Sequence, residues 1–573
     1  MGGADEEDLA LVEFESLHRG REFGRRRLAC GFRGHGSAER SPRGRPTGSA
    51  SATLFGSRGF EPGGGPMKRM TTRSSRIIAL GAAAALAWAC GAPEADAPAE
   101  DSGAGPPNIV LILADDLGYA DIGIYGSEII STPHIDALAA SGVLFTDGYV
   151  SHPVCSPSRA GLVTGRYQQR HGWEFNPAGR DVNAGMSLDE ATLADRLKAL
   201  GYRTGMVGKW HLGHQEPHHP MSRGFDEYFG VLEGGSIFID SSLPGVEYGS
   251  RRGEEGPTER RNKVLRGFEE EKVERYLTDV FTDEAVEFIE RSAAGDEPFF
   301  LYLSHTTPHT PLQATAEYLE GYRHIEDQRT RVYAAMVASL DESVRRVVET
   351  LKAQGVYENT LIAFASDNGC AGYIGNACSN GPLFGFKRYH HEGGVRIPFI
   401  VSWPAEVEGG QEFSHPVITL DYVATFTAAA GEEAETEDSV NLLPYMTGEA
   451  DGAPHEYLYW RAGASLAIRD AQYKLIKLNR TDFRPENLRG DGRLQPPEGG
   501  WPTDSPHGQL TLLYDLDADV GELNNLAAEQ PDVVARLEAE LDSWRGTLLS
   551  ESILPGVRST ITQIDREWVQ LVF

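Results

Sequence analysis

The sequence is poor in cysteine and in cationic side chains. It holds five cysteines in 573 residues: Cys30, Cys90, Cys155, Cys370 and Cys378. That number is too small for a fold held together by a disulfide framework. Lysine and arginine total 53 against 84 acidic residues, which gives a formal net charge of −31. This balance argues against a nucleic-acid-binding protein, because such proteins need a basic face to neutralise phosphates.

A long apolar run is also missing near the N-terminus. The apolar stretch at 77–89 is shorter than the roughly 20 residues of a transmembrane helix. It follows a basic segment that begins at Met67 and it precedes Cys90, which is the order of an export signal. The ending LAWAC is similar to a bacterial lipoprotein cleavage site, so we expect a lipidated Cys90 that tethers the chain to a membrane. Plain signal cleavage is the alternative. In both cases we expect an exported bacterial protein, which is either periplasmic or anchored to the membrane as a lipoprotein.

Composition divides the chain into four segments. Residues 1–66 are rich in Gly, Arg and Ser without an apolar period, and we expect them to be disordered, or untranslated if synthesis starts at Met67. Residues 67–106 are expected to be the signal peptide and a tether. Residues 107–445 are expected to be a catalytic domain, and residues 446–573 a smaller α+β subdomain.

The segment at 107–445 alternates strands and helices. NIVLILADDLG, EPFFLYLS and NTLIAFASDNG are continuous apolar runs that end in polar residues, as buried parallel strands do. A long amphipathic helix is predicted over 331–355. The alternation predicts an α/β fold with a large, mostly parallel sheet between helix layers. Past residue 445, short strands and a closing helix over 532–549 predict a smaller antiparallel sheet packed on the main domain.

Four polar clusters follow predicted strands. They are Asp115 with Asp116, Lys209 with His211, His305 with His309, and Asp367 with Asn368. Ligands of open α/β sheets bind beyond the carboxyl ends of the strands, so we expect one composite site. The oxygen donors of the first and last clusters suit Ca²⁺ or Mg²⁺, and a larger flexible site favours Ca²⁺. Loop capping explains either of these two pairs equally well on its own.

The basic members of these clusters suit anion binding and proton transfer. Lys209 and His211 alternate in an extended segment and are therefore expected to face the same side. A lysine offers a positive charge to an oxyanion, and a histidine moves protons near neutral pH. A solvated surface pair is the alternative. His305 is also compatible with a core histidine, whereas His309, held between two prolines, suits a positioned acid.

The stretch VCSPSR places Cys155 just ahead of a predicted helix. Pro157 suits the first turn of that helix, and the helix N-terminus together with Arg159 favours a nearby anion. One interpretation is a thiolate nucleophile whose pKa is lowered by the helix dipole and Arg159. Another is a buried structural cysteine. Cys370 and Cys378 are close enough to close a small loop in an oxidising compartment, and two unreacted thiols fit equally well.

These motifs together resemble the type I sulfatase family. VCSPSRAGLVTGR resembles its signature, in which Cys-X-Pro-X-Arg directs conversion of the cysteine to formylglycine, and GYRTGMVGKWHLG resembles its second signature. ILADDLG, PHTP, SDNG, GFKRYHHEGGVRIP and LYDLDADVGELNNL resemble further blocks in the family's order. The resemblance covers residues 108–526. SNGPLFGFK…EGGVR resembles the arylsulfatase B-like branch of the alkaline phosphatase superfamily more than the arylsulfatase A-like branch, although Phe384 stands where the B-like branch often has arginine.

The resemblance implies a role for each site residue. Formylglycine formed from Cys155 would be the nucleophile, as a gem-diol held by Arg159. One Ca²⁺ would be bound by Asp115, Asp116, Asp367, Asn368 and the modified Cys155. The residues that hold sulfate and move protons would be Lys209, His211, His309 and Lys387.

The implied activity is removal of O-sulfate from a sulfated sugar or an aryl sulfate, after a formylglycine-generating maturation enzyme has acted on the chain. Export favours a sulfated carbohydrate. A phosphomonoester, phosphodiester or phosphonate hydrolase of the same superfamily is one alternative. A glycan-binding lipoprotein without catalysis and a cysteine hydrolase are two others.

Overall fold

The structure is a computed structural model. It describes residues 105–177, 183–249, 263–434, 436–481, 507–550, 552–554 and 559–572. The predictions for residues 1–104, including the start at Met67, the signal peptide and the lipidated Cys90, lie outside the described residues. Within the ranges given, no helix is both long enough and apolar enough to cross a membrane.

The main sheet contains ten strands in the order β13-β2-β12-β11-β1-β9-β4-β5-β7-β8. Their bounds are β1 (Asn108–Ala114), β2 (Val143–Phe145), β4 (Arg203–Lys209), β5 (Glu227–Val231), β7 (Val264–Arg266), β8 (Glu269–Glu271), β9 (Phe299–Ser304), β11 (Thr360–Ser366), β12 (Phe399–Ser402) and β13 (Gln411–Phe413). The central strands β11, β1, β9, β4 and β5 run parallel. Strands β12 and β7 join them antiparallel at the two sides.

Two small ladders accompany this sheet, and the described ranges contain ten α-helices in all. The ladders pair β3 (Gly148–Tyr149) with β14 (Val417–Ile418), and β6 (Glu247–Tyr248) with β10 (Gln313–Ala314). The helices are α2 (Pro133–Ala140), α3 (Cys155–Thr164), α4 (Leu193–Ala199), α5 (Leu277–Ala293), α6 (Ala316–Leu319), α7 (Gln328–Ala353), α8 (Glu392–Val395), α9 (Asp421–Ala429), α10 (Leu443–Met446) and α11 (Pro531–Arg545). The long helix predicted at 331–355 is α7, which begins earlier because the Asp327 side chain caps it by accepting from the Thr330 amide.

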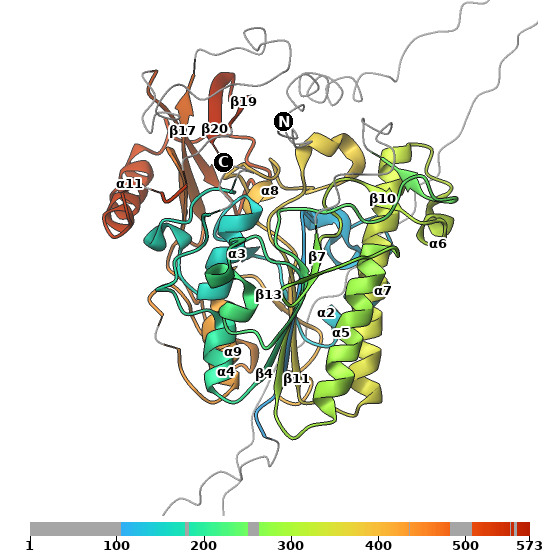
Figure 1. Ribbon diagram of the computed structural model, residues 1–573. Helices are drawn as coiled ribbons and strands as arrows, with labels where there is room; N and C mark the ends of the chain where they lie inside the picture. Colours follow the sequence, from blue (N-terminus) through green and yellow to red (C-terminus); the bar gives the residue numbers. More distant parts are fainter. Residues whose placement is uncertain are drawn as a thin grey trace, which may run out of the picture. The chain divides into compact units, whose positions relative to one another are not determined.

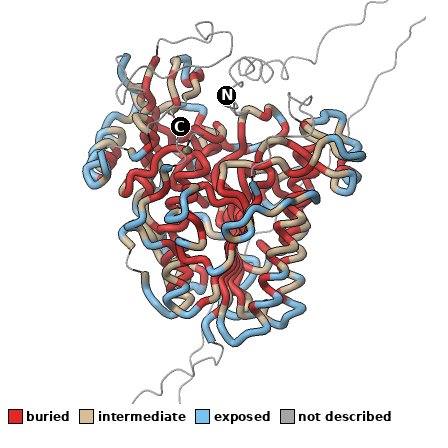
Figure 2. Tube along the Cα trace, viewed as in Figure 1, coloured by how far each residue is buried: buried red, intermediate tan, exposed pale blue. Residues whose placement is uncertain are grey.

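Helices cover both faces of the sheet (Figure 1). Along β1, Ile109, Leu111 and Leu113 pack into one apolar cluster, which includes residues of α3, α4 and α9. The alternate residues Val110 and Ile112 pack into a second cluster with residues of α2, α5 and α7. The central strands are therefore buried on both faces, as Figure 2 shows along the middle of the molecule. The predicted α/β fold class is confirmed.

The register of the parallel strands brings their carboxyl ends to one edge. Ala114, the last residue of β1, pairs with Ser366, the last residue of β11. On the other side of β1, Leu113 pairs with Ser304 of β9, which in turn pairs with Gly208 of β4. The polar residues that follow these strands therefore emerge side by side.

A second sheet follows residue 445, in the order β15-β16-β17-β20-β19, with β18 paired to β17. Its bounds are β15 (Leu458–Ala462), β16 (Ser465–Arg469), β17 (Tyr473–Arg480), β18 (Gln509–Asp515), β19 (Ser559–Ile564) and β20 (Glu567–Val572). All its pairs are antiparallel, as predicted. The hairpin β19–β20 follows α11, so α11 does not close the chain as we expected. Polar residues within β19 and the charged turn residues Asp565 and Arg566 weaken the apolar alternation that would have predicted it.

Trp460 links the second sheet to the segment that follows β3. It is fully buried, and its indole N–H donates to the Val150 carbonyl at 2.7 Å. We expect Trp460→Ala to lower the free energy of unfolding by about 3–5 kcal/mol, because it opens a cavity where the indole packs beside Tyr149. Urea denaturation measures this loss. Leu523, whose side chain is 77% exposed, provides the control, and Leu523→Ala should change stability by less than about 0.5 kcal/mol. Equal losses in the two variants would contradict this role of Trp460.

Candidate functional site

The predicted site residues meet at the carboxyl edge of the main sheet. Asp115 and Asp116 follow β1, Lys209 ends β4, and Asp367 and Asn368 follow β11. The other members come from the start of α3, from the loop after β4, from the loop after β9 and from the segment before α8; they are Cys155, Arg159, His211, His309 and Lys387. All ten side chains are buried, and the most accessible of them, His309, is 8% exposed.

Three cations pair with the three carboxylates of the site. The Lys209 ammonium lies 2.9 and 2.8 Å from the two Asp115 oxygens. Arg159 lies 2.7 Å from an Asp367 oxygen, and a second nitrogen of the same guanidinium donates to the Ser304 hydroxyl at 2.5 Å. These buried ion pairs fix each carboxylate in place, because an unpaired charge here would be costly.

Asp116 is the most heavily contacted carboxylate. The Lys387 ammonium lies 2.9 Å from one of its oxygens, and the Asn368 amide donates to the same oxygen at 2.7 Å. The Tyr373 hydroxyl donates to the other oxygen at 3.1 Å. Its backbone has φ of +65°, a left-handed conformation that is uncommon for a residue other than glycine and occurs often at functional sites.

The environment moves the carboxyl pKa values in different directions. Burial is the largest influence on each and disfavours the charged form. For Asp115 burial prevails over the Lys209 ammonium, and the pKa is raised. For Asp116 the opposing charges of Lys387 and His309 prevail, and the pKa is lowered. For Asp367, Arg159 and Lys209 together hold the pKa far below its ordinary value.

The donor set fits a hard divalent cation. The ligand atoms of Asp115, Asp116, Cys155 and His309 all lie within 4.8 Å of one another. The Asn368 Oδ1 atom is buried and has no hydrogen-bond partner in the described part of the chain. A buried acceptor without a donor beside three carboxylates is the arrangement that a cation completes, and oxygen donors of this kind suit Ca²⁺ or Mg²⁺.

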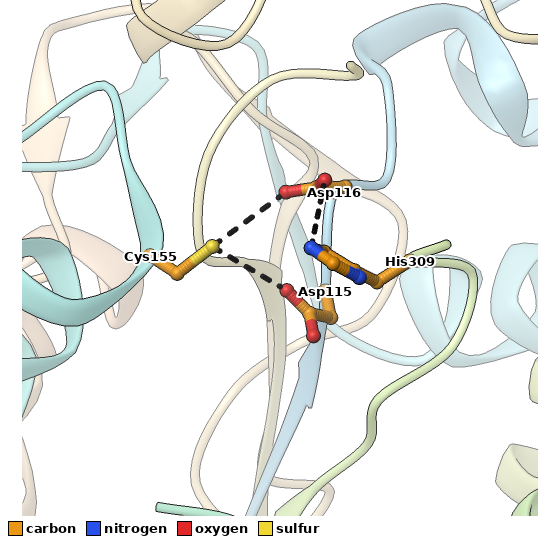
Figure 3. A group of neighbouring side chains, drawn as sticks. All are labelled: Asp115, Asp116, Cys155 and His309. Carbon is orange, nitrogen blue, oxygen red and sulfur yellow. Dashed lines mark hydrogen bonds and ion pairs between the residues drawn. The ribbon is translucent and has the colours of Figure 1, made fainter. Parts of the chain in front are cut away.

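Cys155 faces two of these carboxylates. Its sulfur lies 3.7 Å from an Asp115 oxygen and 3.8 Å from an Asp116 oxygen, as Figure 3 shows. Burial, followed by the charge of Asp367, raises the pKa of the thiol well above its usual range. The lowered pKa expected of a thiolate nucleophile is therefore contradicted. Arg159, which we expected to lower it, is paired with Asp367 instead.

The histidines occupy three different environments. His309 carries a proton on Nδ1, which donates to the Thr310 carbonyl at 2.6 Å, and its Nε2 faces Asp116 at 3.7 Å (Figure 3). His211 has φ of +63°, so strand alternation with Lys209 does not explain its orientation. Burial, followed by Lys209, holds the pKa of His211 well below its usual value. His305 is a core histidine, with Nε2 at 2.9 Å from the Ser343 hydroxyl.

Two contributions to the site were missed by reasoning from the sequence. Ser304 supports Arg159, and Tyr373 contacts Asp116. Neither residue type stands out at its position, because a serine ending a strand and a tyrosine in a loop are common. Tyr373 lies in the loop that a disulfide between Cys370 and Cys378 closes in the structure.

Removal of this disulfide should lower stability. A bridge across eight positions in the chain restricts the unfolded state by about 2–3 kcal/mol. The double variant Cys370→Ser/Cys378→Ser is therefore expected to unfold at lower denaturant concentration than the wild type under non-reducing conditions. Added reductant should shift the wild type and leave the double variant unchanged. A wild type that is insensitive to reductant while the bridge is shown to be cleaved would contradict the prediction.

The chain is similar to known sulfatases in sequence and in structure. The family model described as Sulfatase matches residues 107–432. N-acetylgalactosamine-6-sulfatase of Canis lupus familiaris is 32% identical over 511 residues, which cover 83% of this chain and 90% of that protein. Arylsulfatase J of Mus musculus is 31% identical, over 78% of this chain and 77% of that protein. The crystal structure of Ps i-CgsB in complex with k-i-k-neocarrahexaose is 34% identical, with a TM-score of 0.67, covering 78% of this chain and 95% of that chain.

Proposed function

We propose, from the premise that this chain belongs to the sulfatase family, that it removes an O-sulfate group from a sulfated carbohydrate. The observation that carries the proposal is the closed group of three carboxylates and three cations against which the Cys155 sulfur lies. Such a group can hold a tetrahedral oxyanion and a cation together beside one nucleophile.

The metal and the modified cysteine are part of the proposal. Asp115, Asp116, Asp367 and Asn368, with the modified side chain at position 155, would hold one Ca²⁺. When bound, the ion would polarise a sulfate oxygen and the nucleophile as a Lewis acid. Formylglycine formed from Cys155 by a maturation enzyme would supply a hydrated aldehyde, with one hydroxyl group for attack on sulfur and a second that allows sulfate to leave. The high pKa of the unmodified thiol supports this conversion, because a buried neutral thiol is a poor nucleophile.

The chain's own residues then have separate roles. Lys209 and Lys387 would neutralise sulfate oxygens as their charge increases. His309, whose Nδ1–H donates to the Thr310 carbonyl, would act in its doubly protonated form and donate the Nε2 proton to the leaving alcohol. His211, with a lowered pKa, is neutral at physiological pH and would accept a proton from the second hydroxyl. Arg159 would orient the nucleophile while it holds Asp367.

A sugar substrate is supported by the similar proteins. Two of them are named for a sulfated amino sugar or determined with a bound hexaose. The chain of this protein also covers most of the length of both.

The test compares kcat/KM on an aryl sulfate with that on the matching phosphate, using protein whose formylglycine content is verified. A panel of defined sulfated saccharides follows, with free sulfate as the readout. A preference for the phosphate would overturn the proposal in favour of a phosphoester hydrolase.

The remaining organisation is proposed on the same basis. We place the catalytic domain at 107–445 and the α+β subdomain at 446–573, and we propose export, with a tether at Cys90. Mass spectrometry of the Cys155 peptide from the native host tests the maturation step. An intact thiol there would favour a glycan-binding lipoprotein. N-terminal sequencing of the exported protein tests Met67 and Cys90, and a chain that begins upstream of Met67 would contradict the start site.

A further inference from the structure

The loop after β5 contains two glycines that lie against the two candidate proton-transferring histidines. A Cβ atom added to Gly234 would stand 2.7 Å from Nε2 and 2.8 Å from Cε1 of His211. A Cβ atom added to Gly235 would stand 3.3 Å from Cε1 and Nδ1 of His309. The first pair of distances is shorter than any normal contact, and the second is only tight. At Gly234, therefore, the ring of His211 already occupies the space that a side chain would need.

The backbone of His211 has little freedom to adjust. Its amide donates to the Leu232 carbonyl at 3.2 Å, and its carbonyl accepts from the Ser156 hydroxyl at 2.5 Å. Its φ of +63° is a conformation that neighbouring structure must hold in place. On the His211 side, a clash at the ring is therefore relieved by rotation of the side chain and not by a shift of the backbone.

The ring orientation of His211 depends on shape more than on hydrogen bonding. Its Nδ1 atom is buried and has no hydrogen-bond partner among the described residues. In His309, by contrast, Nδ1 is bonded to the Thr310 carbonyl and fixes the ring. The His211 ring thus packs against the backbone of Gly234, and this contact limits its orientation.

We propose that Gly234 is a positioning residue, whose missing side chain keeps the His211 ring in the orientation required to accept a proton. This inference rests on the proposed function, in which His211 has that role. A methyl group at position 234 would turn the ring by about 1 Å at its tip, and a displacement of that size costs up to about 100-fold in rate. Gly235 has a smaller role, because the ring of His309 has its own hydrogen bond.

The test is Gly234→Ala, with Gly235→Ala as the matched control in the same loop. We expect Gly234→Ala to lower kcat by about 10–100-fold with little change in KM, and Gly235→Ala to stay within about threefold of the wild type. Thermal unfolding and the formylglycine content of each protein are measured alongside. Unchanged kcat in Gly234→Ala, with an active wild type, would overturn the inference and leave the proposed function intact. A wild type that releases no sulfate from any substrate would overturn both.

A double-mutant cycle separates positioning from general damage to the loop. If Gly234 acts through the ring, Gly234→Ala should cause no further loss in a His211→Ala background, because the clashing ring is gone. Losses that multiply would overturn the inference. The same double variant decides the result if Gly234→Ala alone fails to fold. Recovery of folding in the double variant supports the contact with the ring, and continued failure contradicts it.

Discussion

Replacement of Cys155 by serine is expected to abolish turnover while the fold is kept. Serine is close to cysteine in size, and the thiol makes only long contacts of 3.7 and 3.8 Å to Asp115 and Asp116. It presents one hydroxyl group, whereas the formylglycine proposed here presents two. With no second hydroxyl group to expel sulfate, we expect kcat to fall on the order of 10⁴-fold or more.

The serine variant should also retain the sulfate group as a covalent ester on the new serine. Its hydroxyl gives its proton to the Asp367 carboxylate and its oxygen forms a bond to sulfur, while the bond from sulfur to the substrate oxygen breaks and the leaving alcohol takes a proton from His309. The serine sulfate ester then persists. Intact-mass measurement after incubation with substrate should show one added SO₃ group per chain. Cys155→Ala is the control and should show neither turnover nor adduct.

Continued turnover by the serine variant would contradict the need for a second hydroxyl group. Alkylation of the wild-type protein distinguishes a sulfatase that uses formylglycine from a cysteine hydrolase. A cysteine hydrolase would lose activity on alkylation of its thiol, whereas protein fully converted to formylglycine would not react. The raised pKa of the Cys155 thiol already argues against the cysteine hydrolase, because the thiolate is the form that attacks.

The sequence was sufficient to predict that the acidic residues after two strands meet, because parallel strands end at the same edge. Asp115 and Asp367 are 252 positions apart, yet each directly follows a strand, and β1 and β11 are neighbours. Lys387 is different. It lies in a glycine-rich segment with no strand before it, so only the resemblance to a family assigned it a role. Its contact with Asp116 depends on the path of a loop, which residue patterns do not determine.

Orientation and electrostatics were much less predictable. Both Lys209 and His211 are buried at the edge of the sheet, but His211 is oriented by a left-handed backbone and by Gly234, features of two separate segments. The pKa of Cys155 depends on whether Arg159 faces the sulfur or Asp367. The motif contains Cys155 and Arg159 but not Asp367. The motif alone therefore favoured Cys155 as the partner of Arg159, whereas the structure pairs Arg159 with Asp367. Such choices depend on tertiary contacts that compete for one guanidinium.

Removal of divalent cations is the second change with a large expected effect, and the charges of the site explain why. Asp115, Asp116 and Asp367 carry three negative charges, and Arg159, Lys209 and Lys387 carry three positive ones, so the group has no net charge when all are ionised. The whole chain carries a formal charge of −31. An anionic sulfate ester therefore has little to attract it until a divalent cation adds two positive charges. Chelation should reduce kcat/KM by at least about 10³-fold, and Ca²⁺ should restore it better than Mg²⁺.

The same argument predicts a change in stability that does not depend on catalysis. A cation that binds only the folded protein stabilises it by about 2.7 kcal/mol at 100 times its Kd, so Ca²⁺ should raise the Tm of the wild type. Asp367→Asn removes one ligand charge at almost constant shape, and it should abolish the dependence of Tm on Ca²⁺ as well as the activity. Asp517→Asn, at an exposed position just after β18, should behave like the wild type. Full activity in protein shown by elemental analysis to be free of metal would contradict the cation site. Sulfate binding would then have to come from Lys209 and Lys387 alone, after both had left their carboxylates.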